Sequence, residues 1–169
     1  MKILWVVILL ELVACQKSEV VSVYTGNEAK YGLIPASQYT EISGTVTLKE
    51  RKDGSTTILV QLSGTKTNGD EKFPVHLHQG DIASNGSTTL ALLSPVFAKT
   101  GISETVISQL GDETKVTYTD LLKLSAYLNV HLSDYGNGAS IILAAGNIGV
   151  ASSGKIASSS RIGLCTTGK

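Results

Sequence analysis

The sequence contains little cysteine and little charge, and each shortage excludes a class of protein. Cysteine occurs only as Cys15 and Cys165, so the chain cannot carry a dense disulfide framework. Charged residues make up 17%, and 14 Lys and Arg balance 14 Asp and Glu. Without a basic excess, the chain is not expected to bind nucleic acid. Low charge with abundant Gly, Ser and Thr favours an all-β domain over a helical bundle.

Several motifs that carry chemistry are also missing. No serine stands in a nucleophile-elbow pattern, and no glycine-rich loop has the spacing that cradles phosphate. There is no internal repeat of fixed period, and beyond residue 14 no apolar run is long enough to span a bilayer. We therefore assign no catalytic residue from sequence motifs.

The first residues have the layout of an export signal. Met1 and Lys2 supply a positive charge, and an unbroken apolar run from Ile3 to Leu10 follows, interrupted by Glu11. The next four residues, Leu-Val-Ala-Cys ending at Cys15, resemble the lipobox of bacterial lipoproteins. This resemblance implies that residues 1–14 are a lipoprotein signal peptide and that Cys15 is acylated. The alternative is an ordinary signal peptide in which Cys15 is incidental.

A lipid anchor on Cys15 would hold the protein at a membrane without a spanning helix, since several acyl chains make attachment effectively permanent. Gln16 follows the cysteine. By analogy with lipoprotein sorting, this favours the outer membrane of a bacterial cell envelope over the inner one. The lipid-anchored location remains an expectation that depends on the lipobox.

We divide the remaining chain into three parts. Residues 15–38 carry turn residues with little periodicity and predict a tether, although residues 20–24 would also suit an edge strand. Residues 39–149 predict one folded domain, and residues 150–169 a small, polar tail that is either mobile or contains one further strand near residues 161–165. Strands are expected at 41–48, 56–62, 73–79, 88–93, 104–110, 126–132 and 140–148, with one helical turn at 121–124.

Short strands at regular spacing, separated by Gly-rich turns, indicate an antiparallel β-sandwich or barrel. Pro95 predicts that the chain after residue 94 is an edge strand or a loop. The run from Ser140 to Ile148 is strongly apolar and suits a buried central strand.

The three histidines form the main candidate site. His76 and His78 stand one residue apart in a strand-like stretch, so both side chains point to the same face. His131 lies in a second strand-like stretch. If the two strands are neighbours, three imidazoles converge, and imidazole is a ligand that copper and zinc accept. The alternative is that the three side chains are surface or partly buried polar groups without a metal.

Two stretches resemble the CHRD domain family. Val75–Gly80, with the letters VHLHQG, resembles its H-I-H-x-G stretch, and Ala126–His131, with the letters AYLNVH, resembles its later Y-V-N-V-H. This family is similar to copper-zinc superoxide dismutase, and residues 144–149 resemble the closing strand of that enzyme. The resemblance covers about residues 42–149. It implies a Greek-key β-sandwich and assigns His76, His78 and His131 as ligands of copper, with zinc less favoured.

The chain departs from the dismutase pattern where that enzyme does its chemistry. No histidine lies between His78 and His131, so the bridging histidine and the remaining zinc ligands have no counterpart. The resemblance places the enzyme's arginine at Ile142 and its disulfide cysteine at Ala145. Without the arginine, superoxide loses a guiding positive charge.

Three functions are compatible with the sequence. The first is a copper-binding domain of an envelope lipoprotein, without enzymatic activity. The second is a copper-dependent superoxide dismutase, which the missing groups disfavour. The third is a metal-free structural or adhesive module. Four residues are candidate neighbours of the site: Asp81 and Asp134 as acceptors that orient a histidine or as turn residues, and Tyr127 and Tyr135 as pocket walls or as core residues.

Overall fold

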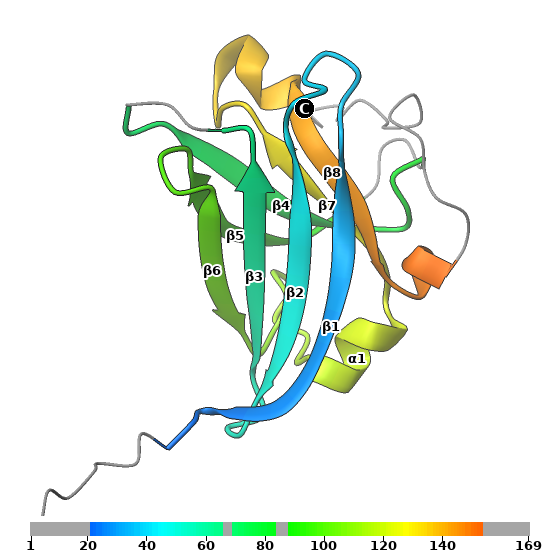
Figure 1. Cartoon of the computed structure of the whole chain (residues 1–169). Helices are drawn as coiled ribbons and strands as arrows, with labels where there is room; N and C mark the ends of the chain where they lie inside the picture. Colours follow the sequence, from blue (N-terminus) through cyan, green and yellow to red (C-terminus); the bar gives the residue numbers. More distant parts are fainter. Residues whose placement is uncertain (1–20, 66–68, 84–87, 154–169) are drawn as a thin grey trace, which may run out of the picture.

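The computed structural model describes residues 21–65, 69–83 and 88–153, and these form a closed antiparallel β-barrel. Around the barrel the strand order is β1-β2-β3-β6-β5-β4-β7-β8 (Figure 1). The prediction of an all-β antiparallel fold is confirmed. The strands are β1 (Tyr24–Pro35), β2 (Ser43–Arg51), β3 (Thr56–Ser63), β4 (Lys72–Gln79), β5 (Thr89–Phe97), β6 (Ile102–Ile107), β7 (Ser125–His131) and β8 (Ile142–Gly149).

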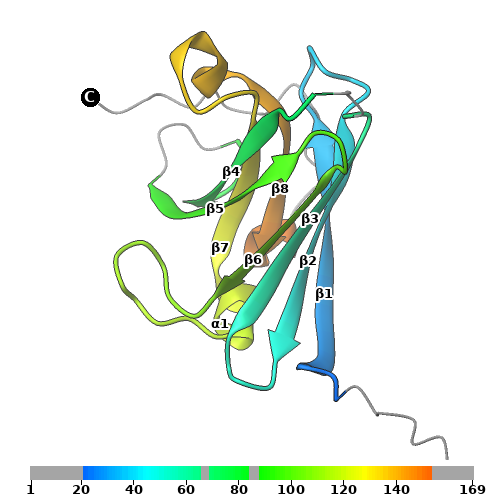
Figure 2. The same ribbon diagram turned by 90° about the vertical axis from the view of Figure 1, so that its left-hand side faces the viewer.

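The helical segments are short and lie at opposite ends of the barrel. The α-helix α1 (Tyr118–Lys123) precedes β7, and the 3₁₀ helices are η1 (Gly136–Ser140) and η2 (Val150–Ser153). In Figures 1 and 2, α1 and the beginning of β1 lie at the lower end, and η1 lies at the upper end. No helix in the described part of the chain has the length and apolar character needed to cross a bilayer.

Two of the contacts that close the barrel are narrow. β1 meets β8 through two residue pairs, Ile34 with Ala145 and Pro35 with Ala144. β5 meets β6 through one pair, Phe97 with Ile102. The remaining neighbours pair over most of their length, so the barrel consists of two broad sheets joined along two narrow seams (Figure 2).

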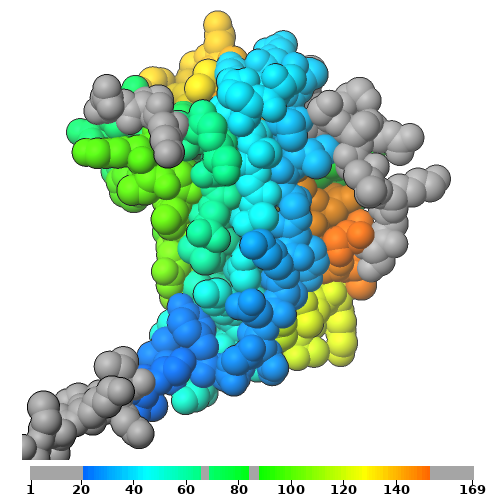
Figure 3. Space-filling model, viewed as in Figure 1, coloured from blue at the N-terminus to red at the C-terminus, as the bar shows by residue number. Residues whose placement is uncertain are grey.

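The tether predicted over residues 15–38 is wrong for residues 24–35, which form β1. This strand pairs with β2 over seven positions, and Figure 3 shows the two side by side on one face of the molecule. Its first residues are largely exposed, and only Leu33 is fully buried. Ala29, Tyr31 and Leu33 alternate with exposed residues, but the exposed, turn-like residues before Ala29 leave this pattern short.

The strands predicted in the rest of the domain are confirmed, with shifted ends. The helical turn predicted at 121–124 is α1, with Thr117 and Asp120 forming a capping box at its start. β5 continues beyond Pro95 to Phe97 and stays paired with β4. The proline has no N–H for a partner, which agrees with the sparse pairing between β5 and β6.

The barrel encloses the main hydrophobic core. Val75 and Leu77 of β4 are fully buried in it, as are Leu128 and Val130 of β7. These inward residues alternate with the residues between them, which therefore face away from the barrel axis. The strands of the three histidines are held by this core, while the imidazoles lie outside it.

Candidate metal centre

β4 places two histidines on the outer face of the barrel. Val75 and Leu77 point into the core, so His76 and His78 must point outward. β4 pairs with β7 in antiparallel register, and the partners of the two histidines are Asn129 and Tyr127. The same-face prediction for His76 and His78 is thus confirmed.

β7 places the third histidine on that face. With Leu128 and Val130 in the core, the outward residues of this strand are Tyr127, Asn129 and His131. His131 is the last residue of β7 and lies next to the segment that leads to η1. The two strands are neighbours in the sheet, as the convergence of the histidines required.

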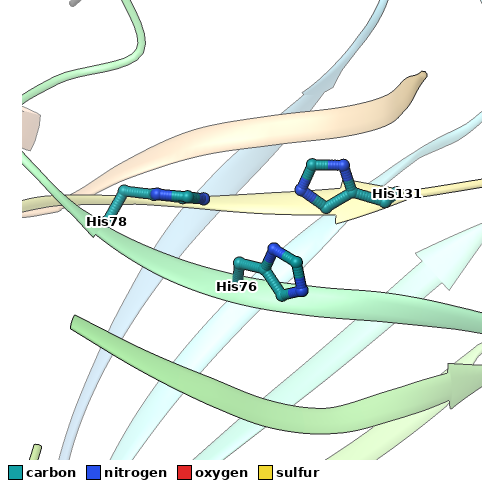
Figure 4. A group of neighbouring side chains, drawn as sticks. All are labelled: His76, His78 and His131. Atoms are coloured by element: carbon teal, nitrogen blue, oxygen red, sulfur yellow. The ribbon is translucent and has the colours of Figure 1, made fainter. Parts of the chain in front are cut away.

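The three imidazoles converge (Figure 4). The ring centroids of His76 and His131 are 4.5 Å apart, and those of His76 and His78 are 5.9 Å apart. One ring nitrogen of each histidine lies within 4.8 Å of the corresponding nitrogens of the other two. The structure therefore brings together all three residues that the sequence predicted as a metal site.

Two of the histidines are nearly inaccessible to solvent and one is not. His131 is 1% exposed and His78 is 5% exposed, whereas His76 is half-buried. A second apolar cluster lies beside the site, outside the barrel core, and consists of Ile82, Tyr127, Ile142 and Ala145, with Ile34 packed against it. Access from solvent to the three nitrogens is therefore expected on the side of His76.

Neighbouring groups fix the two buried rings. The phenol ring of Tyr127 stacks on His78 with centroids 5.0 Å apart and an angle of 18° between the planes. The hydroxyl of Thr89, on β5, lies 3.4 Å from Nδ1 of His78. A hydrogen bond links the ring of His131 to the backbone of Ala139 in η1. Contacts of this kind orient metal-binding imidazoles in proteins.

The surroundings favour the neutral form of His131 and His76. Burial is the main cause that lowers the pKa of His131 to about 4; nearby His76 and His78 act in the same direction, and the hydrogen bond to Ala139 opposes the shift. Burial also lowers the pKa of His76, although the charge of Asp134 acts in the opposite direction. A neutral imidazole is the form that binds metal, so no proton has to be displaced from His131 near pH 7.

The donor set fits a borderline transition-metal ion. Three nitrogens at about 2.0–2.1 Å from one ion lie at most about 4.2 Å apart. The observed limit of 4.8 Å is close to this value, so binding of an ion would draw the three nitrogens slightly closer together. Three imidazoles without a carboxylate in the set suit copper or zinc better than magnesium or calcium. They leave at least one coordination position open.

The four candidate neighbours of the site have different roles. Tyr127 stacks on His78 as a wall of the site, whereas Tyr135 is 82% exposed. The carboxylate of Asp81 accepts a hydrogen bond from the backbone N–H of Ala83, which is a turn contact. Asp134 acts on His76 through its charge. Cys15 and Cys165 lie outside the described residues, as does the strand considered near residues 161–165.

The sequence did not identify Thr89 or Asn129 as part of this site. Thr89 reaches His78 only because β5 pairs with β4, with Thr89 opposite His78, and this register follows from no local pattern. Asn129 was visible as a polar residue in a strand that is otherwise largely apolar. A polar residue in an apolar strand indicates a buried polar side chain, but it does not predict which groups that side chain contacts.

Ile142 and Ala145, where the dismutase resemblance places an arginine and a cysteine, are both buried in the second apolar cluster. They provide neither a charge nor a sulfur atom to the outer face. This part of the surroundings is apolar, in contrast to the positive charge that guides superoxide in the enzyme.

Comparison with known proteins gives one family. The model of the CHRD domain matches residues 20–139, which cover most of the chain and include both histidine stretches. No curated protein and no solved structure matches significantly. The matched region begins before β1 and ends within η1, so it contains all three candidate ligands. The chain belongs to the CHRD domain family.

Proposed function

We propose that this protein is a copper-binding domain of a lipid-anchored cell-envelope protein and that His76, His78 and His131 hold the ion. The observation that carries the proposal is the convergence of one nitrogen from each ring within 4.8 Å. The lowered pKa of His131 supports it, because the ligand is already deprotonated.

We infer further that the barrel has the Greek-key connectivity of the copper-zinc superoxide dismutase fold. β4, β5 and β6 are consecutive neighbours, β7 returns to the free side of β4, and β3 lies beside β6. Three consecutive strands with a fourth that returns beside the first define a Greek key. The preference for copper over zinc comes from the resemblance of the three histidines to the copper ligands of that enzyme. The strand connectivity does not distinguish the two metals.

The lipid anchor on Cys15 is the localisation part of the proposal. β1 begins at the end of the barrel where α1 lies, and η1, which contacts His131, lies at the opposite end (Figure 1). An anchor that precedes β1 would put the α1 end toward the membrane and the η1 end away from it. The metal site would then be accessible from the aqueous side of the envelope.

Copper titration of the domain without its first 20 residues tests the metal proposal. We expect one equivalent of Cu(II) to bind the wild-type domain with a paramagnetic resonance signal typical of nitrogen ligands. The double variant His78→Ala, His131→Ala is expected to lose this binding. Equal uptake by the wild type and the double variant would overturn the proposal and favour a metal-free structural module.

Two further measurements separate the remaining alternatives. Superoxide dismutation by the copper-loaded domain is expected near background, because Ile142, at the position of the enzyme's arginine, provides no guiding charge. For the anchor, full-length protein is expected in the detergent phase after phase partitioning, and the Cys15→Ala variant in the aqueous phase. The same phase for both proteins would remove the lipoprotein assignment.

A further inference from the structure

Four large apolar side chains are exposed on the outer face of the neighbouring strands β5 and β6, and we call them the β5–β6 patch. On β5 they are Leu92, which is 72% exposed, and Phe97, which is 47% exposed. On β6 they are Val106 and Ile102, which are 50% and 43% exposed. Phe97 and Ile102 are directly opposite each other, and Figure 2 shows both strands on the side of the barrel that faces the viewer. Exposed apolar side chains that gather in one place mark interaction surfaces, whereas scattered ones do not.

The centre of the β5–β6 patch is polar. Ser94 lies between the two apolar residues of β5, and its backbone N–H donates to Oγ1 of Thr105 at 2.9 Å. Glu104 precedes Thr105 and lies between the two apolar residues of β6. The hydroxyl of Tyr24 donates to Oε1 of Glu104 at 3.3 Å. Across the seam between the strands, an exposed serine on β5 therefore stands beside an exposed glutamate on β6.

The two strands carry almost no charge that would prevent association. β5 has no charged residue, and Glu104 is the one charged residue of β6. Exposed strands at the margin of a sheet are usually protected by charged side chains, lysine above all. The whole chain has a formal net charge of zero, so long-range repulsion does not keep two copies apart. A second copy of the chain can therefore approach this face.

The arrangement of the patch favours one symmetric pairing of two copies. In a two-fold interface, residue i contacts residue j of the second copy, and j contacts i. An axis parallel to the strands places β5 of each copy against β6 of the other. Apolar residues then meet at both ends of the patch, and the hydroxyl of Ser94 donates to the carboxylate of Glu104 in the second copy. An axis perpendicular to the strands would instead place the two Glu104 carboxylates against each other, which is repulsive.

We propose that the β5–β6 patch is the interface of a symmetric homodimer in which β5 of each copy packs against β6 of the other. Phe97 contacts Ile102 of the second copy, and Leu92 contacts Val106 of the second copy. The dimer does not require a metal ion. Leu92 is opposite His76 in the pairing of β5 with β4, so the interface borders the accessible side of the metal centre.

Sedimentation velocity of the domain without its first 20 residues, over a range of concentrations, tests for the dimer. A chelator removes metal, and Cys165→Ser excludes disulfide dimers. Val106→Lys is expected to weaken dimerisation by about tenfold or more, because it places a charge in an apolar contact. Val150→Lys is the matched control, since Val150 is also 50% exposed but lies outside the patch. This control is expected to dimerise like the parent protein.

Single cysteines test which strands meet in the dimer. In the Cys165→Ser background, Leu92→Cys and Val106→Cys are oxidised separately and as an equal mixture. The proposed axis brings Leu92 of one copy to Val106 of the other. A disulfide is therefore expected between the two variants in the mixture, and none within either variant alone.

Three results would overturn the proposal. The first is a dissociation constant of the parent protein weaker than about 1 mM. The second is equal dimerisation by Val106→Lys and Val150→Lys, which would place the interface on another surface. The third is a disulfide dimer of Leu92→Cys alone, which contradicts the axis. If the Tm shows that Val106→Lys is not folded, Leu92→Lys takes its place, because Leu92 is the most exposed residue of the patch.

Discussion

The imidazole rings of His76 and His131 lie 4.5 Å apart, centroid to centroid, although they belong to different strands. The rings are tilted by 43°, and neither carries a charge at neutral pH because burial lowers both pKa values. Two neutral imidazoles can share one metal ion but cannot both be protonated at this distance without repulsion. This relationship makes metal binding and proton binding at the site compete.

The first prediction concerns the stability of the metal-free protein below neutral pH. The pKa of His131 is about 4 in the folded protein and near 6.5 in the unfolded chain. Between these values the unfolded chain binds the proton more tightly, so stability is fully present above pH 6.5 and is lost as pH falls toward 4. The loss is on the order of 3 kcal/mol. Urea unfolding in the presence of a chelator measures it.

The control for this prediction is His131→Gln, which cannot titrate. The variant is expected to lose most of the slope in the free energy of unfolding between pH 6.5 and 4, with a smaller slope left from His76. If the wild type and the variant show the same slope over this interval, His131 is not the group responsible.

The second prediction concerns copper and stability. An ion that binds only the folded protein stabilises it by about 2.7 kcal/mol at a free concentration one hundred times Kd. We expect copper to raise the Tm of the chelator-treated domain by several degrees. The variant His78→Ala, His131→Ala should show no such rise, and magnesium should have no effect on either protein because imidazole nitrogens are poor ligands for it. A rise of equal size in the double variant would place the copper elsewhere.

Much of this site could be predicted from the sequence because its geometry follows from strand periodicity. The spacing of His76 and His78 sets a common face in any strand. That His131 joins them depends on β4 and β7 being neighbours, which the sequence alone left as a condition. The resemblance to the dismutase implied that the three histidines share one ion, and the pairing of β4 with β7 fulfils the condition.

The parts that could not be predicted depend on contacts between distant residues. β1 was expected to be a tether because it is largely exposed and gains its order from pairing with β2. The seam between β1 and β8 and the approach of Thr89 to His78 also depend on register. Local patterns carry no information on register between strands, since a shift by one residue changes every contact.

The third prediction concerns the hydroxyl of Thr89. It lies 3.4 Å from Nδ1 of His78 and favours metal binding through the other nitrogen of that ring. Loss of a hydrogen bond to the second ring nitrogen of a metal-binding histidine commonly changes metal affinity by about 10–100-fold. The long distance here indicates an effect at the lower end of this range. Thr89→Val, which keeps the shape, should therefore weaken copper binding by about tenfold with little change in Tm. Thr89→Ser keeps the hydroxyl and should bind like the wild type; identical affinities in all three proteins would show that the contact is irrelevant.

The fourth prediction concerns two glycines at the seam between β1 and β8. A Cβ atom on Gly146 would lie 2.1 Å from the backbone carbonyl oxygen of Gly32, whereas a Cβ on Gly32 would meet nothing within 4 Å. The two substitutions should therefore differ strongly, although both glycines lie at the same seam. Gly146→Ala must push the strands apart where only two residue pairs join them, at a cost of about 1–3 kcal/mol or more. Gly32→Ala is expected to stay within about 1 kcal/mol of the wild type.

Because β8 also pairs with β7, opening this seam should disturb the position of His131, so copper affinity is expected to fall in Gly146→Ala and not in Gly32→Ala. Urea unfolding and copper titration of the two variants measure both effects, and equal stabilities would mean that the seam adapts without strain.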